Sequence, residues 1–277
     1  MGIIGSNNVR RSNYEKPRHQ VELSTYYISR YPVTVAQYKE FVQAGGYQAE
    51  RYWQEAIAVD QWKAGKIQGR IKPDADYPPF NLSNHPVIGV TWYEAIAFTR
   101  WLTERWHASG QLSKDDVIRL PTEAEWEKAA RGGEKIPKNT VIVSCCQSSL
   151  EQSEMINNPQ PNRIYPWGNE IDNDRLNYEK TKIGATNSVG CFASGVGPYG
   201  CEEMSGNVRE WCMDWYGLYS SEKVTDPRGP SKGSYRVLRG GSWAGSALGC
   251  RSAVRNGWYR PGYRIQNLGF RLFRGQH

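Results

Sequence analysis

The stretch RLPTEAEWEKAARGG, which runs from Arg119 to Gly133, contains one complete helix with both of its ends marked in the sequence. Thr122 and Glu125 have the spacing of a capping box, in which each side chain accepts a hydrogen bond from the other residue's backbone N–H. Gly132 follows the last helical residue, a position where glycine commonly ends a helix. We expect the indole of Trp126, within this helix, to face the core.

Two other stretches carry the same start signal. Thr34 and Gln37 have capping-box spacing around the start of VTVAQYKEFV, and a Gly-Gly pair at 45–46 follows that stretch. Thr91 and Glu94 likewise open WYEAIAFTRWLTERW, in which apolar residues recur with helical spacing. The sequence therefore predicts three capped helices.

The remaining chain predicts short strands and irregular segments. His19–Tyr27 alternates apolar and polar residues as a half-buried strand does, and Tyr235–Trp243 and Asn267–Phe273 are strand-like. Residues 47–90 are irregular, and residues 133–163 are polar and contain proline, as a surface insertion does. We predict a single α+β domain over residues 1–277.

The composition limits the classes of function. The chain has 277 residues with a net charge of +7, 11 Trp and 17 Tyr, which indicates a globular protein with aromatic packing. It has no apolar run suited to a signal peptide or a membrane span, and its six cysteines form no C-x-x-C pair. We therefore expect a cytoplasmic protein with reduced thiols and no membrane partner. No nucleic-acid-binding module is recognisable, and fusion to further domains stays open.

Seven strings occur in a fixed order: YPVTVAQYKEFV, HPVIGVTWYEAIAFTRWL, RLPTEAEWEKAARGG, YPWGNE, MSGNVREW, RVLRGGSW and NLGFRL. Together, from about His19 to Phe273, they resemble the formylglycine-generating-enzyme (sulfatase-modifying factor) family. The resemblance implies a C-type-lectin-like fold with little regular secondary structure. That family hosts cysteine oxidation, sulfoxide synthesis and binding without chemistry, so the fold alone leaves the function open.

The oxidising members of the family use two cysteines, five residues apart, to hold copper. Matched position by position, the resemblance puts these cysteines at Ala247 and Ser252, and neither is a thiol. Cys250 lies nearby, but one thiol cannot give two-coordinate copper, and we expect a small buried residue there. The four histidines are scattered, so iron is not expected either. An oxidoreductase related to formylglycine-generating enzyme or sulfoxide synthase is the alternative.

Two kinds of residue alternate between Trp243 and Leu268. The scaffold-like residues, which we call the anchor residues, are Cys250, Arg251, Ser252, Ala253, Arg255, Pro261, Arg264 and Asn267. The others, which we call the display residues, are Trp243, Ala244, Gly245, Ser246, Ala247, Leu248, Gly249, Val254, Asn256, Gly257, Trp258, Tyr259, Gly262, Tyr263, Ile265 and Gln266. This arrangement resembles the variable region of proteins diversified by diversity-generating retroelements, in which adenine-rich template codons are rewritten.

The display residues are suited to recognition. Trp258, Tyr259 and Tyr263 offer large, rigid contact area at low entropic cost, and the Gly and Ser between them allow close approach. We predict a ligand-binding surface for a protein partner, without catalysis. Two alternatives stay open: these aromatics pack into the core, or the chain is a plain interaction domain of a larger signalling protein.

The resemblance also implies structural calcium. At the MSGNVREW turn the matching ligands are the Glu203 and Glu210 carboxylates with the Gly206 and Val208 carbonyls, and a second site would begin at Asn177 and the Tyr178 carbonyl. Carboxylate, amide and carbonyl oxygens are the ligands that calcium prefers. The alternative is that these groups only cap turns.

Overall fold

The computed structural model describes residues 1–5, 13–140, 142–144 and 153–276. In these ranges the α-helices are α1 (Val35–Gln43), α2 (Gln54–Ile57), α3 (Trp92–Ala108) and α4 (Glu123–Arg131). Short 3₁₀ helices are η1 (Asn13–Glu15), η2 (Glu50–Tyr52), η3 (Glu179–Thr181), η4 (Ala193–Gly195) and η5 (Ala247–Cys250).

The three predicted helices are confirmed together with their capping boxes. In α4, the Thr122 hydroxyl accepts from the Glu125 N–H at 3.3 Å, and the Glu125 carboxylate accepts from the Thr122 N–H at 2.7 Å. Gly132 follows α4 with a φ of 80°, a value that L side chains rarely adopt. The four-residue helix α2 was not predicted, because it is too short for helical periodicity to register.

A four-stranded sheet in the order β12-β11-β9-β13 positions the C-terminal stretch. Its strands are β9 (Arg209–Trp215), β11 (Arg236–Arg239), β12 (Asn256–Tyr259) and β13 (Leu268–Gly269). β11 pairs antiparallel with both β9 and β12, and β13 pairs parallel with β9. β12 is therefore an edge strand.

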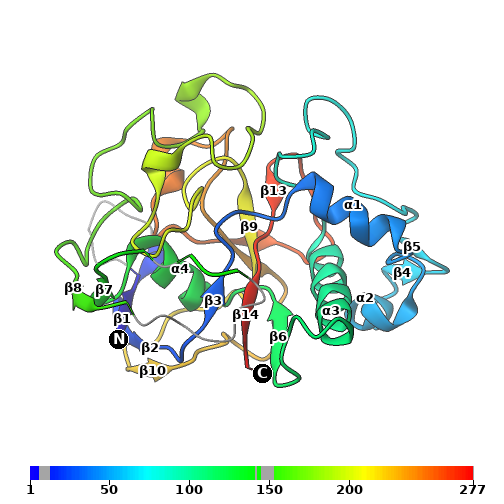
Figure 1. Cartoon of the computed structure of the whole chain (residues 1–277), viewed down its shortest axis with the longest axis horizontal. Coiled ribbons are helices and arrows are strands. Elements are labelled where there is room, and N and C mark those ends of the chain that lie inside the picture. The colour runs from blue at the N-terminus through cyan, green and yellow to red at the C-terminus, as the bar shows by residue number, and fades with distance from the viewer. Residues whose placement is uncertain (6–12, 141, 145–152, 277) are drawn as a thin grey trace.

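Smaller sheets complete the fold. They are β1 (Gly2–Ile4) with β2 (His19–Glu22) and β10 (Val224–Thr225), β3 (Tyr27–Ile28) with β14 (Phe273–Gln276) and β6 (Asp116–Arg119), β4 (Trp62–Lys63) with β5 (Lys66–Ile67), and β7 (Lys135–Pro137) with β8 (Met155–Asn157). α3 and α1 lie on one side of β9, and α4 lies on the other (Figure 1). The predicted α+β class with little regular structure is confirmed.

Two predicted elements need correction. The strand predicted for His19–Tyr27 is two strands, because β2 ends at Glu22 and the Ser24 backbone and hydroxyl instead donate to the Asp226 carboxylate at 2.8 and 2.6 Å. The predicted insertion at 133–163 contains the β7–β8 pair, and Asn158 and Arg163 at its end are buried. Its residues 141 and 145–152 lie outside the described ranges.

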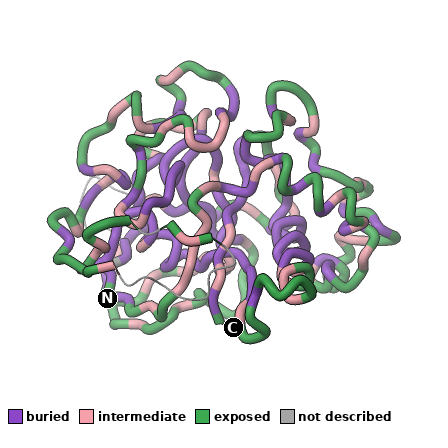
Figure 2. The backbone as a smooth tube through the Cα atoms, in the orientation of Figure 1, coloured by how far each residue is buried: buried purple, intermediate pink, exposed green. Residues whose placement is uncertain are grey.

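The core gathers around α3 and the four-stranded sheet, and exposed loops surround it (Figure 2). Trp126 and Trp211 have exposed fractions of 0%. Each indole N–H has a buried acceptor, namely the Glu210 carboxylate at 2.7 Å for Trp126 and the Val90 carbonyl at 3.1 Å for Trp211. The expectation that Trp126 faces the core is confirmed.

A buried carboxylate caps the start of α4. Asp214 on β9 accepts a hydrogen bond from the Glu123 N–H at 2.8 Å. Burial, and then repulsion from the Glu123 carboxylate, raise the pKa of Asp214 to about 7. In the unfolded chain an Asp side chain titrates near 4, so folding binds a proton here, and this stability is lost as the pH rises from about 4 to about 7.

We expect Asp214→Asn to stabilise the protein at pH 8, because the amide oxygen keeps the cap without a buried charge. The advantage should be on the order of a few kcal/mol at pH 8 and should shrink at pH 5. Urea unfolding at the two pH values measures it, with the exposed Asp115→Asn as the matched control. An equal effect of Asp214→Asn at both pH values would contradict the prediction.

Candidate binding face

The structure separates the anchor residues from the display residues by burial. All the anchor residues except Arg264 are buried, and all the display residues except Gly257 are exposed or half-buried. Leu248, Trp258 and Tyr263 have exposed fractions of 71%, 65% and 42%. The alternation that the sequence shows is thus an alternation of burial, and Trp258 and Tyr263 do not belong to the core.

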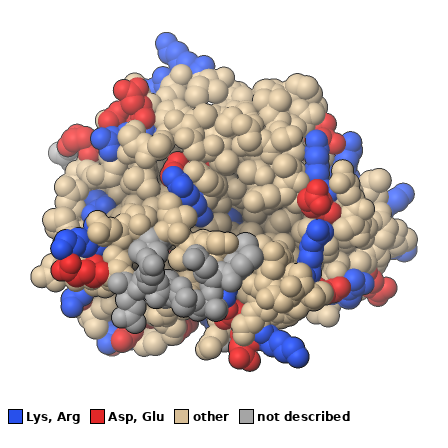
Figure 3. Space-filling view, viewed as in Figure 1, with Lys and Arg blue, Asp and Glu red and all other residues tan. Residues whose placement is uncertain are grey.

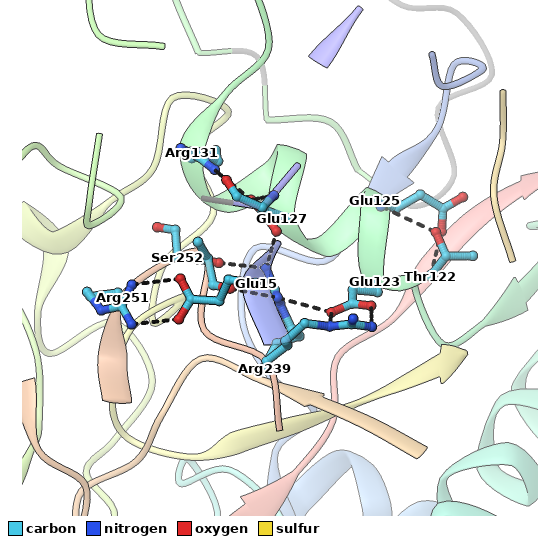
Figure 4. A network of polar contacts seen from close by, with 12 residues as sticks. Glu15, Thr122, Glu123, Glu125, Glu127, Arg131, Arg239, Arg251 and Ser252 are labelled. Atoms are coloured by element: carbon cyan, nitrogen blue, oxygen red, sulfur yellow. Dashed lines mark hydrogen bonds and ion pairs between the residues drawn. The ribbon is translucent and has the colours of Figure 1, made fainter. Parts of the chain in front are cut away.

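Two anchor residues are fastened by bidentate ion pairs in the network of Figure 4. Arg251 donates to the Glu15 carboxylate at 2.9 and 2.7 Å, and Arg255 donates to the Glu123 carboxylate at 2.8 and 2.5 Å. All four side chains are buried. Paired N–H···O contacts of this kind fix orientation as well as distance, so the backbone between the display residues is held rigidly.

Arg239 on β11 joins α4 to the anchor residues (Figure 4). Its guanidinium pairs with Glu123 at 3.1 Å and Glu127 at 2.5 Å, and it donates to the Ser252 and Ala253 carbonyls at 2.7 and 3.3 Å. Burial disfavours its charge, but the two carboxylates outweigh that effect and hold the pKa of Arg239 above its usual value. One buried cation therefore sets the position of the helix and of the C-terminal stretch.

Trp258 lies on the edge strand β12 beside two aromatic residues that the sequence reasoning missed. Its ring centroid is 5.8 Å from that of Tyr14, in an edge-to-face contact, and 6.3 Å from that of Tyr235. Tyr14 is itself 42% exposed. Tyr14 is distant in the sequence and follows residues with no recognisable pattern, so no local signal could have placed it here.

Tyr259 is less exposed than a display residue should be. It is half-buried and packs against the main core, and its ring centroid is 4.9 Å from that of Tyr263. Tyr259, on β12, pairs with Arg236 on β11. The Arg236 guanidinium lies between the Trp92 and Trp215 rings, 3.7 and 3.5 Å from their centroids. Tyr259 thus serves the scaffold as well as the surface.

Gly257 was predicted as a display residue, but its burial differs from that of the others. It is buried, and a Cβ atom at this position would lie 2.0 Å from the ring of Tyr216. The aromatic ring fills the space that a side chain would need. Gly257 therefore belongs with the anchor residues.

The loop after β12 is held by a segment far away in the sequence. Gln68 donates to the Gly262 carbonyl at 2.9 Å, and Asp74 forms an ion pair with Arg264. A cavity of about 250 Å³ lies between the two segments and is lined in part by Tyr77. The sequence reasoning described this segment only as irregular, and its role in positioning the display residues was missed.

The positions of the family's catalytic thiols carry no comparable chemistry here. Ser252 is fully buried and its hydroxyl has no hydrogen-bond partner in the described residues, while Ala247 is half-buried in η5. Cys250 is fully buried, as predicted, and burial raises the pKa of its thiol to about 11. A thiol of this kind stays protonated at neutral pH and is a poor nucleophile or metal ligand.

The predicted calcium ligands are only partly suitable. Both Glu210 oxygens accept hydrogen bonds from Arg271, at 2.6 and 2.9 Å, and one also accepts from Trp126, so Glu210 is corrected from a calcium ligand to a buried ion-pair partner. Glu203 is buried, one of its carboxylate oxygens has no partner among the residues that the structure describes, and burial raises its pKa to about 8. The side-chain amide of Asn177 donates to the Ala185 carbonyl and to Asn187, which leaves its role as a ligand a prediction.

Comparison with known proteins places these features in context. Residues 3–276 match the family described as the sulfatase-modifying factor enzyme 1-like domain. The chain is 32% identical over 276 residues to serine/threonine-protein kinase pkn1 of Chlamydia pneumoniae, which covers 98% of this chain and 36% of the kinase. It is 31% identical to the formylglycine-generating enzyme of Thermomonospora curvata, over 83% of this chain and 74% of the enzyme.

A solved structure of similar shape is Treponema denticola variable protein 1. The two share 26% identity with a TM-score of 0.67, over 98% of this chain and 91% of that one. The chain thus spans about a third of the kinase-named relatives it matches, at 36%, 35% and 34% of their lengths, but nearly all of the variable protein. Among the described residues, no helix is long and apolar enough to cross a bilayer.

We expect Trp258→Ala and Tyr263→Ala to change the free energy of unfolding by no more than about 0.5 kcal/mol, because both side chains face water. Trp126→Ala and Trp211→Ala should each cost about 3–5 kcal/mol, because both rings are fully buried. Tyr259→Ala should fall between the two groups. Urea midpoints of the five variants measure this, and a Trp258→Ala cost equal to that of Trp126→Ala would place the display residues in the core.

Proposed function

The chain belongs to the sulfatase-modifying factor family, and from that premise we propose that it is a non-catalytic module that binds a protein through its display residues. The observation that carries the proposal is the alternation of burial between Trp243 and Leu268. An ion-paired backbone presents side chains that are mostly exposed or half-buried, although Trp243, Ala247 and Tyr259 also pack against buried residues. Such positions can change without unfolding the protein, and this is the physical requirement of a diversified surface.

The chemistry of the display residues favours a protein partner. They include no charged residue, and one exposed charged residue, Arg260, lies among them. The face drawn in Figure 3 shows acidic and basic side chains interspersed, without a large field of one sign. Trp and Tyr on a rigid base, with small residues between them, resemble the composition of antibody binding surfaces.

Variable protein 1 of Treponema denticola supports the finer part of the proposal. Its name describes a variable protein, and its fold is shared over nearly the whole of this chain. We infer that the display residues here are diversified in the same manner, by rewriting of adenine-rich codons. Gly257 is the exception, because the Tyr216 ring excludes any side chain there.

The second candidate is an interaction domain within a larger protein. It is favoured by the kinase-named relatives, in which the matching region makes up about a third of the chain, at 36% in Chlamydia pneumoniae. A face formed by fixed residues would then bind one constant partner. We also infer a reducing, cytoplasmic location, supported by the four cysteines in the described ranges, Cys191, Cys201, Cys212 and Cys250, which have free thiols there.

Calcium remains part of the proposal in a reduced form. One carboxylate oxygen of buried Glu203 has no partner among the described residues, so it fits an oxygen-ligated cation, with the Gly206 and Val208 carbonyls as further ligands. Asn177 and the Tyr178 carbonyl would belong to a second site. Glu210 is left out, because Arg271 occupies it. When bound, calcium would neutralise the Glu203 charge and stabilise the surrounding loops.

We expect an imperfect copy of the DNA encoding residues 243–268 in the flanking genomic sequence, beside a reverse transcriptase gene. Mismatches should fall at adenines of the copy in display codons, and the anchor codons and the Gly257 codon should be unchanged. Sequencing the flanking DNA tests this. A region without such a copy leaves the constant interaction domain as the better account.

The enzyme alternative is tested separately. We expect no conversion of a cysteine-containing sulfatase peptide in the presence of copper and oxygen, because Ala247 and Ser252 replace the thiols and Cys250 is buried and protonated. Mass spectrometry of the peptide measures conversion, with a catalytically active family member as the positive control. Turnover that co-purifies with the protein and is abolished by Cys250→Ala would overturn the non-catalytic assignment.

A further inference from the structure

A mostly apolar cavity lies away from the display residues. It has a volume of about 660 Å³ and lies between β3, β14 and β6, residues Lys128 and Ala129 of α4, and the β7–β8 pair. In Figure 1 these elements occupy the lower front of the molecule. None of the display residues lines it. A volume of this size falls within the range of about 300–1,000 Å³ that is typical of small-molecule sites.

The walls of this cavity are largely apolar and aromatic. Tyr26, Trp106, Tyr199 and Phe273 face it, together with Met155 from β8. The Tyr26 and Phe273 rings stack with centroids 5.6 Å apart, and Phe273 is almost fully buried because the Arg119 guanidinium also lies 3.4 Å from its ring centroid. The Tyr26 hydroxyl is held by the Glu125 carbonyl at 2.8 Å, which fixes the ring.

The charges around the cavity have a single sign. Arg30, Lys128 and Arg274 are among the described lining residues, and no Asp or Glu is. Arg30 is paired with Glu202 at 2.5 Å, and Arg274 is paired with Asp116 at 3.1 Å. Of the three described lining cations, one therefore lies outside these two ion pairs, and it can attract an anion into the cavity.

Lys128 is that cation. It is half-buried on α4, and in the described part of the chain it forms no ion pair or hydrogen bond. Its ammonium group lies 5.6 Å from the centroid of the Tyr26 ring. Burial lowers the pKa of Lys128, and this effect outweighs the Asp226 and Glu125 charges, which act in the opposite direction. An ammonium that is desolvated without a counter-ion gains most from an anion placed beside it.

We propose that this cavity binds a small amphipathic anion, with an aliphatic or aromatic body against Tyr26 and Trp106 and a carboxylate-type head on Lys128. The inference does not depend on the proposed binding face. An acidic protein segment is disfavoured, because Lys128 is the one cation among the described lining residues that lies outside the ion pairs. Lys128 supplies selectivity for the head group, and the aromatic wall supplies most of the affinity.

Three probes with the same chain and different heads test the proposal: decanoate, decanol and decyltrimethylammonium. We expect isothermal titration calorimetry on the full chain to show decanoate binding about tenfold more tightly than decanol, the magnitude of a charge-assisted hydrogen bond. The cationic probe should bind most weakly. Equal affinity for decanoate and decanol, or no binding of either, would overturn the proposal.

Variants locate the site. Lys128→Met should remove the preference for decanoate and leave decanol binding unchanged, while Lys128→Arg should retain the preference. Met155→Asp, at a side chain that is 48% exposed, should weaken decanoate binding by placing a like charge in the cavity. Lys114→Met, at an exposed lysine outside the cavity, and Trp258→Ala, on the display face, serve as controls that should leave all three affinities unchanged. If Trp258→Ala weakens decanoate binding and Lys128→Met does not, the probe binds the display face instead.

Discussion

A guanidinium that never reaches water holds this fold together. Arg239 has an exposed fraction of 0% and has two carboxylates of α4 on one side and two carbonyls of the C-terminal stretch on the other. Burying a charge is costly unless it is paired, and removing one partner from such a pair leaves an uncompensated charge that costs about 3–5 kcal/mol. The arrangement is therefore all-or-none: α4, β11 and the anchor residues adopt their places together. It converts a loop-rich C-terminal region into a defined surface.

The local features of the fold could be predicted from the sequence. Capping boxes at Thr34, Thr91 and Thr122 depend on residues three apart, so the start of each helix is encoded where it occurs. The division into anchor and display residues rests on the resemblance to variable proteins, because Ala, Ser and Asn occur in both groups. Contacts across the chain could not be predicted in this way. Glu127 and Arg239 are 112 residues apart, and neither has a neighbour that indicates the other.

The errors in the site share that cause. Tyr259 has the residue type of a recognition surface, yet its place opposite Arg236 gives it a part in the scaffold. Glu210 has the type and position of a metal ligand, yet Arg271 reaches it from 61 residues away. Residue type indicates what a side chain can do, but its partners decide which of these things it does. The same fold thus accommodates relatives named as enzymes and a relative named as a variable protein without a change of architecture.

The contact of Gly257 with the ring of Tyr216 has a consequence for anyone who would use this chain as a scaffold for selected binders. In a library randomised at all the display positions, most members would carry a side chain at residue 257. Its Cβ atom would lie 2.0 Å from the Tyr216 ring, so β12 could not keep its place unless that ring moved. Holding this one codon constant would recover those members without removing a contact surface, because a glycine presents no side chain. Natural diversification would meet the same steric limit, and a codon without adenine at position 257 would keep the glycine unchanged.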